Sequence, residues 1–272
     1  MRPQGEAADQ GKGVFPMSPY RSTAVAVLAV AFLSILAIPA AAAPKPALKA
    51  AAKPAALSRD EIRQAERWLA DLGYWTGPAD GAWDDVSRHA LIAFQKIQHA
   101  KATGRLTRAE YNALSVAGPP RPRELGEHIE VDLARQVLFL VDADGRVGNI
   151  LPISSGSGKT FHEKGYPETH AVTPCGHLEV YTRASGWKTS PLGEMYNPLY
   201  IVGGIAIHGS LDVPAYPASH GCIRIPMFAS QRLPHMVPNR MPVYVYGCKG
   251  ETPVNQIAVA PVGTERVGAG EE

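Results

Sequence analysis

The chain lacks the many cysteines of a disulfide scaffold, the strong positive charge of a nucleic-acid-binding protein and the polar composition of a disordered protein. Its 272 residues include three cysteines, too few for a disulfide-stapled fold and an odd number that leaves at least one thiol unpaired. Lys and Arg (27) exceed Asp and Glu (25) by two, so no basic surface predicts a nucleic-acid partner. Charged residues make up 19% and hydrophobic residues 45%, which excludes an intrinsically disordered chain and a coiled coil. The length allows one large domain or two modest ones.

An apolar run near the N-terminus predicts export. Ala24–Ile38 form this run, Arg21 precedes it and small residues follow, which are the three parts of a secretory signal. We interpret residues 1–43 as a signal peptide or an N-terminal anchor, with Met17 as an alternative start. The protein contacts a membrane only if this segment stays uncleaved. We therefore expect an exported protein of the periplasm or the cell wall.

Capping motifs predict short helices after a Pro/Ala/Lys linker at residues 44–57. Ser58 and Glu61 form a capping box ahead of apolar residues at helical spacing. Thr107 and Glu110 form another, ahead of a shorter helix.

A third helix lies between these two, and Asp84 or Asp85 caps its start. Residues 58–116 therefore predict a three-helix bundle that is only marginally stable alone. Three aromatic residues of the bundle either stack on sugar or, as we favour, belong to its core: Trp68, Tyr74 and Trp75.

The pattern changes to period two after a second, Pro-rich linker at residues 117–126. Residues 127–248 predict a β-rich domain, and residues 249–272 a disordered tail. The strand candidates are Ile129–Asp132, Val137–Val141, Val147–Ser154, His177–Thr182, Tyr200–His208 and Val243–Tyr246, and the one helical candidate is Met227–Met236. The fold class is therefore α+β and multidomain, a small three-helix bundle followed by a β-rich domain. Because two Pro-rich linkers set the bundle apart, we expect it to tether the protein rather than to shape the catalytic cleft.

The strongest candidate for a catalytic motif is Ser219-His220-Gly221-Cys222, which places a thiol directly after a glycine. A cysteine is a useful nucleophile only as the thiolate, so it needs a nearby base or cation that lowers its pKa. Two histidines are available, His220 and His208, which ends a predicted strand fourteen residues before the cysteine. The backbone N–H groups of Gly221 and Cys222 are placed to bind the oxyanion of a tetrahedral intermediate. These residues outline an acyl-transfer site.

Two families resemble separate parts of the chain. The L,D-transpeptidase (YkuD-type) catalytic domain is similar over roughly residues 127–247, and a small three-helix peptidoglycan-binding domain is similar over the bundle. The first similarity rests on His208-Gly209, a proline-bearing spacer and Ser219-His220-Gly221-Cys222-Ile223-Arg224, with Thr173-Pro174-Cys175-Gly176 and Ser190-Pro191-Leu192-Gly193 as further matches. The second rests on Leu72-Gly73-Tyr74, Asp80-Gly81, Ala90 and Phe94-Gln95, and departs from the family at Trp83-Asp84-Asp85-Val86-Ser87.

The resemblance implies an enzyme that acts on peptidoglycan stem peptides and glycan, without metal or other cofactor. Carried over onto the matching positions, Cys222 is the nucleophile, His208 is the base, and the carbonyl of Gly209 orients the imidazole. Cys222 would attack the carbonyl between the diamino residue and the terminal D-Ala of a tetrapeptide stem, which leaves a thioester. An amine of a neighbouring stem would then give a 3→3 cross-link, whereas water would make the enzyme an L,D-carboxypeptidase. The resemblance also implies that a carbapenem acylates Cys222.

Other chemistries fit less well. His208, His220 and Cys222 as zinc ligands would lack the tight C-x-x-C or H-x-x-x-H pairs of zinc sites. Cysteine peptidases of the papain or NlpC/P60 type place Cys ahead of His, whereas here His208 precedes Cys222. A degenerate, non-catalytic binding module would not need the intact Ser-His-Gly-Cys element.

Several residues keep two interpretations. His220 either lines the oxyanion site or holds the loop, and Arg224 either grips a substrate carboxylate or, as we favour, braces the loop. Ser219 is expected to form hydrogen bonds within the loop. Cys175 and Cys248 either pair in an oxidising compartment or stay apart, because the sequence does not determine their distance.

Overall fold

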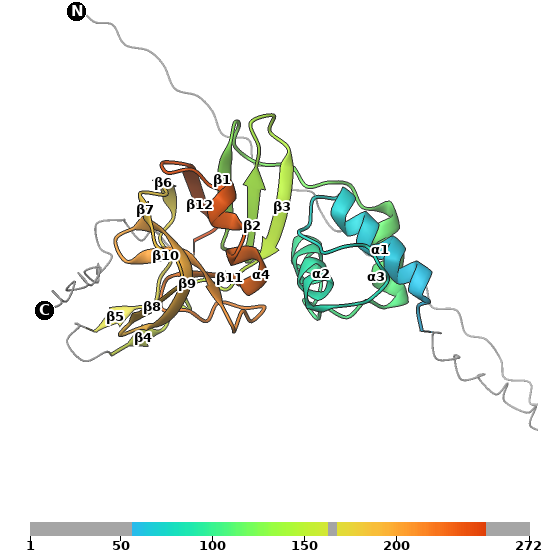
Figure 1. Ribbon diagram of the computed structural model, residues 1–272. Helices are drawn as coiled ribbons and strands as arrows, with labels where there is room; N and C mark the ends of the chain where they lie inside the picture. The colour runs from blue at the N-terminus through green and yellow to red at the C-terminus, as the bar shows by residue number, and fades with distance from the viewer. Residues whose placement is uncertain (1–55, 163–167, 249–272) are drawn as a thin grey trace, which may run out of the picture. The chain divides into compact units, whose positions relative to one another are not determined.

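The computed structural model describes residues 56–162 and 168–248 (Figure 1). The expected signal or anchor, almost all of the first linker and the expected tail lie outside these ranges. Within them, no helix is long and apolar enough to cross a membrane. Three helices come first and a β-rich region follows, which confirms the predicted α+β class.

Local capping residues begin each of the three N-terminal helices. They are α1 (Arg59–Asp71), α2 (Asp85–Ile97) and α3 (Arg108–Val116). Both predicted capping boxes are present, the first with the Ser58 side chain accepting from the backbone of Glu61. Asp84 rather than Asp85 caps α2, because its Oδ1 accepts the N–H of Ser87 at 2.8 Å.

Two five-stranded sheets and one two-stranded sheet make up the β-rich region. The first sheet has the order β3-β2-β1-β12-β6, in which only β1 and β12 run parallel. The second sheet has the order β11-β10-β9-β7, and β8 also pairs with β9. In this second sheet β10 runs parallel to β11. The strands of the first are β1 (His128–Asp132), β2 (Val137–Val141), β3 (Val147–Pro152), β6 (Gly176–Glu179) and β12 (Pro242–Tyr246). Those of the second are β7 (Thr182–Arg183), β8 (Trp187–Ser190), β9 (Gly193–Val202), β10 (Ile205–Ser210) and β11 (Ile223–Pro226). The small sheet pairs β4 (Thr160–Phe161) with β5 (Thr169–His170), and the short helices α4 (Met227–Ser230) and α5 (Leu233–Met236) follow β11.

The two large sheets share one hydrophobic core. Apolar side chains of β1, β2 and β12 pack with those of β9, β10 and β11, and nearly all are fully buried. Members of this core include Ile129, Leu138, Val243, Leu199, Ile207 and Ile223.

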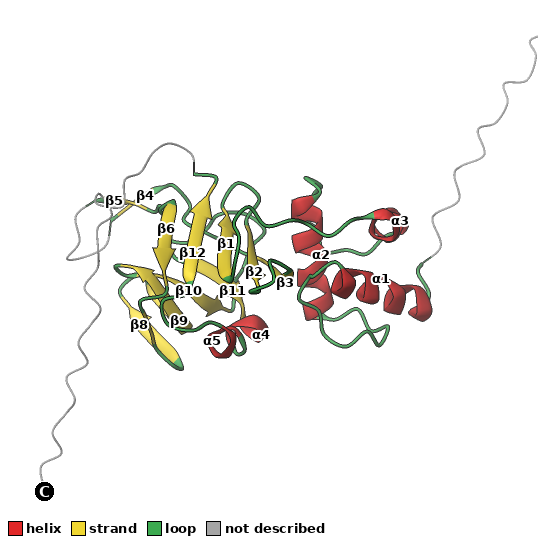
Figure 2. Ribbon diagram, turned by 90° about the horizontal axis from the view of Figure 1, so that it is seen from above, coloured by secondary structure: helices red, strands yellow, loops and turns green. Residues whose placement is uncertain are grey.

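Strand β2 is apolar throughout because both of its faces are buried. Leu138 and Leu140 point into the core between the sheets, whereas Val137, Phe139 and Val141 belong to a second core with the helices. That second core contains Leu69, Leu91, Phe94 and Leu114 from the bundle and Ile150 from β3. Helix α2 lies beside β3 in both views (Figures 1 and 2).

The helices therefore cover the outer face of β2 and β3 in the first sheet, and the expectation that linkers set the bundle apart from the β-rich domain is wrong. A bundle too small to bury its own apolar face gains that burial from the sheet. Tyr74 and Trp75, 4% and 5% exposed, lie in the two cores, which confirms the favoured interpretation of these aromatics, and partly buried Trp68 packs on Tyr111.

Three predicted elements differ from the structure. The expected strand Tyr200–His208 is a hairpin, in which β9 and β10 run antiparallel around a turn at Gly203-Gly204. The expected strand His177–Thr182 is divided, because the chain leaves the first sheet after β6 and joins the second at β7. Met227–Met236 forms two short helices instead of one. Apolar runs on both sides of a break look continuous in sequence, so only strand pairing separates them.

Candidate active site

The parallel pairing of β10 and β11 brings Cys222 and His208 to the same face of the second sheet. Ile207 lies opposite Ile223, and His208 opposite Arg224, so Cys222, directly ahead of β11, is level with Ala206. Side chains alternate between the faces of a strand, and level residues of neighbouring strands share a face. Both side chains line one cavity of about 1740 Å³. Pairing alone therefore unites two residues that are fourteen positions apart.

Gly221 allows residues 219–222, which we call the cysteine loop, to pass close to neighbouring residues. Its φ is +143°, and a Cβ there would lie 2.7 Å from Cδ1 of Ile205 and 3.0 Å from the carbonyl oxygen of Val172. A larger residue would push the loop, and Cys222 with it, away from the sheet.

Ser219 forms the predicted hydrogen bonds within the loop. Its Oγ donates to the carbonyl of Cys222 at 2.6 Å and accepts the N–H of Gly221 at 3.0 Å. The expectation that the Gly221 N–H is free for an oxyanion is therefore wrong, because Ser219 occupies this donor. Of the two N–H groups that we predicted to bind the oxyanion, only that of Cys222 remains a candidate.

The imidazole of His208 is held in its neutral form. It is 4% exposed, and its Nδ1 lies 3.0 Å from the carbonyl of Gly209. A carbonyl only accepts, so Nδ1 carries the proton and Nε2 keeps its lone pair. Burial lowers the pKa of His208 to about 4, with a smaller contribution from the charge of Arg224, while the Gly209 carbonyl acts in the opposite direction.

Helix α4 requires glycine at position 209. A Cβ there would lie 2.1 Å from Oγ of Ser230 and 2.7 Å from its Cβ. This close approach keeps the Gly209 carbonyl beside the imidazole.

Burial of the Cys222 thiol favours its protonated form by raising its pKa. Its Sγ lies 3.7 Å from the carbonyl oxygen of Gly204 and 4.0 Å from Sδ of Met195, and no hydrogen bond joins it to an imidazole within residues 56–162 and 168–248. Burial raises the pKa of Cys222, against hydrogen bonding by the backbone of Ala206 and the charge of Arg224. The expectation of a thiol with a lowered pKa is thus wrong, and a neutral thiol accompanies a neutral imidazole.

His220 and Arg224 lie at the cavity but make no hydrogen bond to the thiol. The exposed His220 ring packs edge-on against Phe161, with ring centroids 4.8 Å apart. Arg224 lies 3.7 Å from the carboxylate of Asp212, and its main chain pairs with Ser154 in both directions. Among the described residues no group of three His, Cys, Asp or Glu side chains is arranged to hold a metal ion, so the zinc interpretation gains no support.

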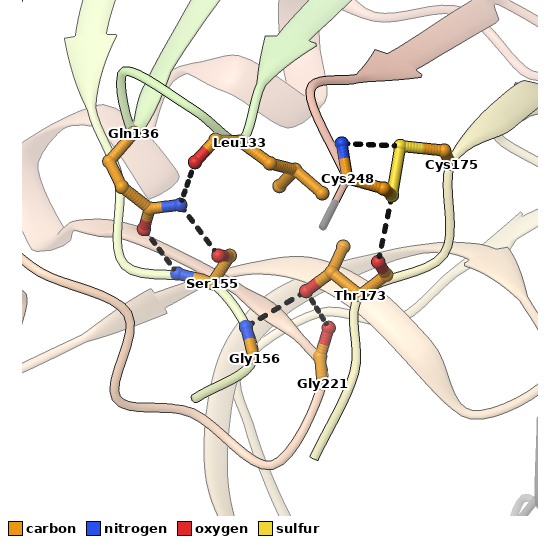
Figure 3. Close-up of a disulfide and its surroundings, with 8 residues drawn as sticks. All are labelled: Leu133, Gln136, Ser155, Gly156, Thr173, Cys175, Gly221 and Cys248. Atoms are coloured by element: carbon orange, nitrogen blue, oxygen red, sulfur yellow. Dashed lines mark hydrogen bonds between the residues drawn. A yellow bond between two sulfur atoms is a disulfide. The ribbon is translucent and has the colours of Figure 1, made fainter. Parts of the chain in front are cut away.

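Thr173 contacts the cysteine loop from its other side, a contact that the sequence did not reveal. Its Oγ1 donates to the carbonyl of Gly221 at 2.6 Å and accepts the N–H of Gly156 at 2.9 Å (Figure 3). Two residues further along, Cys175 is joined to Cys248 in a disulfide, with Cα atoms 6.0 Å apart (Figure 3). The disulfide therefore decides the open question of pairing and leaves Cys222 as the free cysteine. The Thr-Pro-Cys-Gly turn was visible in the sequence, but its contact with the loop was not.

Comparisons with known proteins match both parts of the chain. A putative peptidoglycan binding domain matches residues 58–114, and an L,D-transpeptidase catalytic domain matches residues 126–245. The crystal structure of an L,D-transpeptidase from Xylanimonas cellulosilytica DSM 15894 is 38% identical, with a TM-score of 0.64, and the match covers 68% of this chain and 93% of that one. A second L,D-transpeptidase, from Stackebrandtia nassauensis, is 20% identical with a TM-score of 0.41, and the match covers 71% of this chain and 94% of that one. The comparison with curated proteins gave no match.

Proposed function

Because this chain belongs to the L,D-transpeptidase family and carries a peptidoglycan-binding domain, we propose that it cross-links peptidoglycan tetrapeptide stems through a thioester on Cys222. In this transpeptidase-type enzyme, which has peptidoglycan as its partner, we assign Cys222 as the nucleophile, His208 as the base and a 3→3 linkage as the product.

In the first half of the reaction, Sγ of Cys222 attacks the carbonyl between the diamino residue and the terminal D-Ala. Nε2 of His208 takes the thiol proton and passes it to the departing amine, so that D-Ala leaves as a neutral amine and a thioester remains. In the second half, an amine of a neighbouring stem attacks the thioester, loses its proton to Nε2 and releases the thiol. The energy of the first peptide bond is kept in the thioester, so no nucleotide is consumed.

One observation carries the proposal: a neutral imidazole, with Nδ1 bound to the Gly209 carbonyl, shares a cavity and a sheet face with the free thiol. Because the pKa of His208 lies near 4 and that of Cys222 is raised, the two groups are neutral together at pH 7. The proton then moves as the substrate carbonyl is attacked, which is general-base catalysis rather than attack by a preformed thiolate.

Two further assignments belong to the same proposal. Besides bracing the loop, the interpretation favoured from the sequence, Arg224 lines the cavity and offers a positive charge to a substrate carboxylate. The exposed His220 also lines the cavity. We place the enzyme outside the cytoplasm, in the periplasm or the cell wall, where its substrate is found. Water as the acceptor in place of an amine gives the alternative activity, an L,D-carboxypeptidase.

Mass spectrometry of purified tetrapeptide muropeptides incubated with the full chain tests the function. We expect dimers that have lost one D-Ala, whereas tripeptide monomers alone would identify the carboxypeptidase. Cys222→Ala should fold normally and lose all transfer, since removal of a nucleophile costs several orders of magnitude. A tenth of wild-type turnover in Cys222→Ala would contradict the nucleophile.

The rate of Cys222 acylation by a carbapenem, followed by intact mass, tests the base. His208→Ala should slow acylation at pH 7 by roughly 100- to 10,000-fold, the contribution of a general base, with the rate rising as pH approaches the thiol pKa. His220→Ala is the matched control and should stay within about threefold of wild type. If only His220→Ala slows the reaction, the base is His220.

A further inference from the structure

A buried lysine of the helical domain connects that domain to the cysteine loop. Lys96 of α2 is 7% exposed, and its Nζ donates to two backbone carbonyls of the β-rich region, those of Gln136 at 2.9 Å and Ile153 at 3.0 Å. Burial lowers the pKa of Lys96 to about 7. A neutral amine still has two N–H donors, so both hydrogen bonds persist when the proton is lost.

The side chain of Gln136 continues from this contact. Its Oε1 accepts the N–H of Ser155 at 2.9 Å, and its Nε2 donates to Oγ of Ser155 at 2.7 Å and to the carbonyl of Leu133 at 2.8 Å (Figure 3). Gln136 is buried and has a φ of +57°, an uncommon conformation for a residue other than glycine. Nζ of Lys96 donates to the carbonyl of Gln136, and so secures this turn.

Ser155 in turn binds the segment that leads to the nucleophile. Its carbonyl accepts the N–H groups of Ala218 and Ser219, both at 2.9 Å. Ser219 then binds the carbonyl of Cys222 and the N–H of Gly221, as described above. Every member of this relay is at least half-buried, so water does not readily replace a lost partner.

We propose that Lys96 is a positioning residue, through which the peptidoglycan-binding domain holds the Cys222 loop in its reactive geometry by way of Gln136, Ser155 and Ser219. This proposal rests on Cys222 as the nucleophile. It gives the helical domain a part in catalysis on soluble substrates, in addition to any part in binding the wall. Small errors in the placement of a nucleophile are costly, because a displacement of about 1 Å lowers the rate by about 100-fold.

Variants of the full chain separate this role from plain loss of stability. Lys96→Met keeps an apolar stem of similar length and removes both hydrogen bonds, whereas Lys96→Arg keeps donors and charge. The matched control is Phe94→Leu on the same helix, which loosens the shared core at a side chain with no polar atom to form hydrogen bonds in the relay. For each variant, urea unfolding gives the stability, and carbapenem acylation of Cys222, measured over a range of carbapenem concentrations, gives the maximal rate and the half-saturation concentration.

We expect Lys96→Met to lower the maximal acylation rate by roughly 10- to 100-fold with little change in half-saturation, and Lys96→Arg to restore part of it. Phe94→Leu should stay within about twofold of wild type in rate, although it unfolds more easily. If Lys96→Met does not fold, Gln136→Met breaks the next link and should give the same loss.

Equal rates in Lys96→Met and wild type, or equal losses in Lys96→Met and Phe94→Leu, would overturn the positioning role. The absence of any Cys222 adduct in the folded wild type would instead refute the proposed function, so the two failures are distinguishable.

Discussion

Removal of the disulfide between Cys175 and Cys248 should destabilise the enzyme strongly. The two cysteines are 73 residues apart, so the bond closes a long loop in the unfolded chain. Loop-closure entropy for that length corresponds to about 4 kcal/mol at 25 °C, if the folded state is unchanged. The folded state does keep its other contacts there, since β12 still pairs with β6 and β1 next to both cysteines.

Urea unfolding of the double variant Cys175→Ala/Cys248→Ala measures this loss. With a slope of about 2 kcal/mol per molar urea, the midpoint should fall by about 2 M, and the melting temperature by about 10 °C. Both proteins should carry Cys222→Ala, so that the remaining thiol cannot form a new disulfide. Alkylation in denaturant before and after reduction counts the thiols, and in the unaltered chain should modify one cysteine without reductant and three with it.

The same variant tests a link to the site. Thr173, two residues before Cys175, donates to the carbonyl of Gly221, so loss of the disulfide should slow carbapenem acylation in the protein that retains Cys222. A loss of stability below about 1 kcal/mol would refute the entropy argument, and an unchanged acylation rate would show that Thr173 stays in place without the bond.

Further predictions concern the neighbours of the site and the bundle. Gly209→Ala should destabilise the protein by about 1–3 kcal/mol in urea unfolding, because its Cβ meets Ser230, and adding Ser230→Gly should recover part of the loss. Glu66→Ala should cost about 2–4 kcal/mol, because the buried carboxylate accepts the hydroxyl of Ser87 and a turn amide, and Glu66→Gln should cost less; equal costs would contradict this. The pKa of His208, about 4 in the folded protein, lies below its usual 6.5, so the unfolded chain binds the proton first as pH falls. Stability should therefore decline by about 3 kcal/mol between pH 6.5 and pH 4, and His208→Asn should remove that part of the pH dependence measured by urea unfolding.

The three helix starts were predictable because each depends on residues within one turn. Ser58 with Glu61, and Thr107 with Glu110, satisfy one another's backbone donors across three positions, so no distant part of the chain takes part. Likewise, the prediction of a nucleophile at Cys222 depends only on its immediate neighbours, Ser219 to Gly221. Asp84 and Asp85 could not be told apart, because either side chain can reach a free N–H at that helix start.

Strand boundaries depended on pairing partners far along the chain. The glycines at 203 and 204 turn the chain back on itself, but the apolar residues on both sides had the composition of one continuous strand. Only the pairing of β9 with β10 separates them.

The sequence alone determined that a helical bundle precedes a β-rich domain, the two capping boxes, the Ser-His-Gly-Cys motif and the family resemblance, since all of these are carried by neighbouring residues. Tertiary structure decided which cysteines pair, where the helical domain lies, and which backbone donor near Cys222 is already occupied. Lys96 shows the difference most clearly. In the sequence it is one basic residue at the end of a helix, and its contact with Gln136 forty positions later exists only because the bundle packs on the sheet. Contacts of that kind depend on which apolar faces pack together, and the spacing of residues along the chain does not determine that packing.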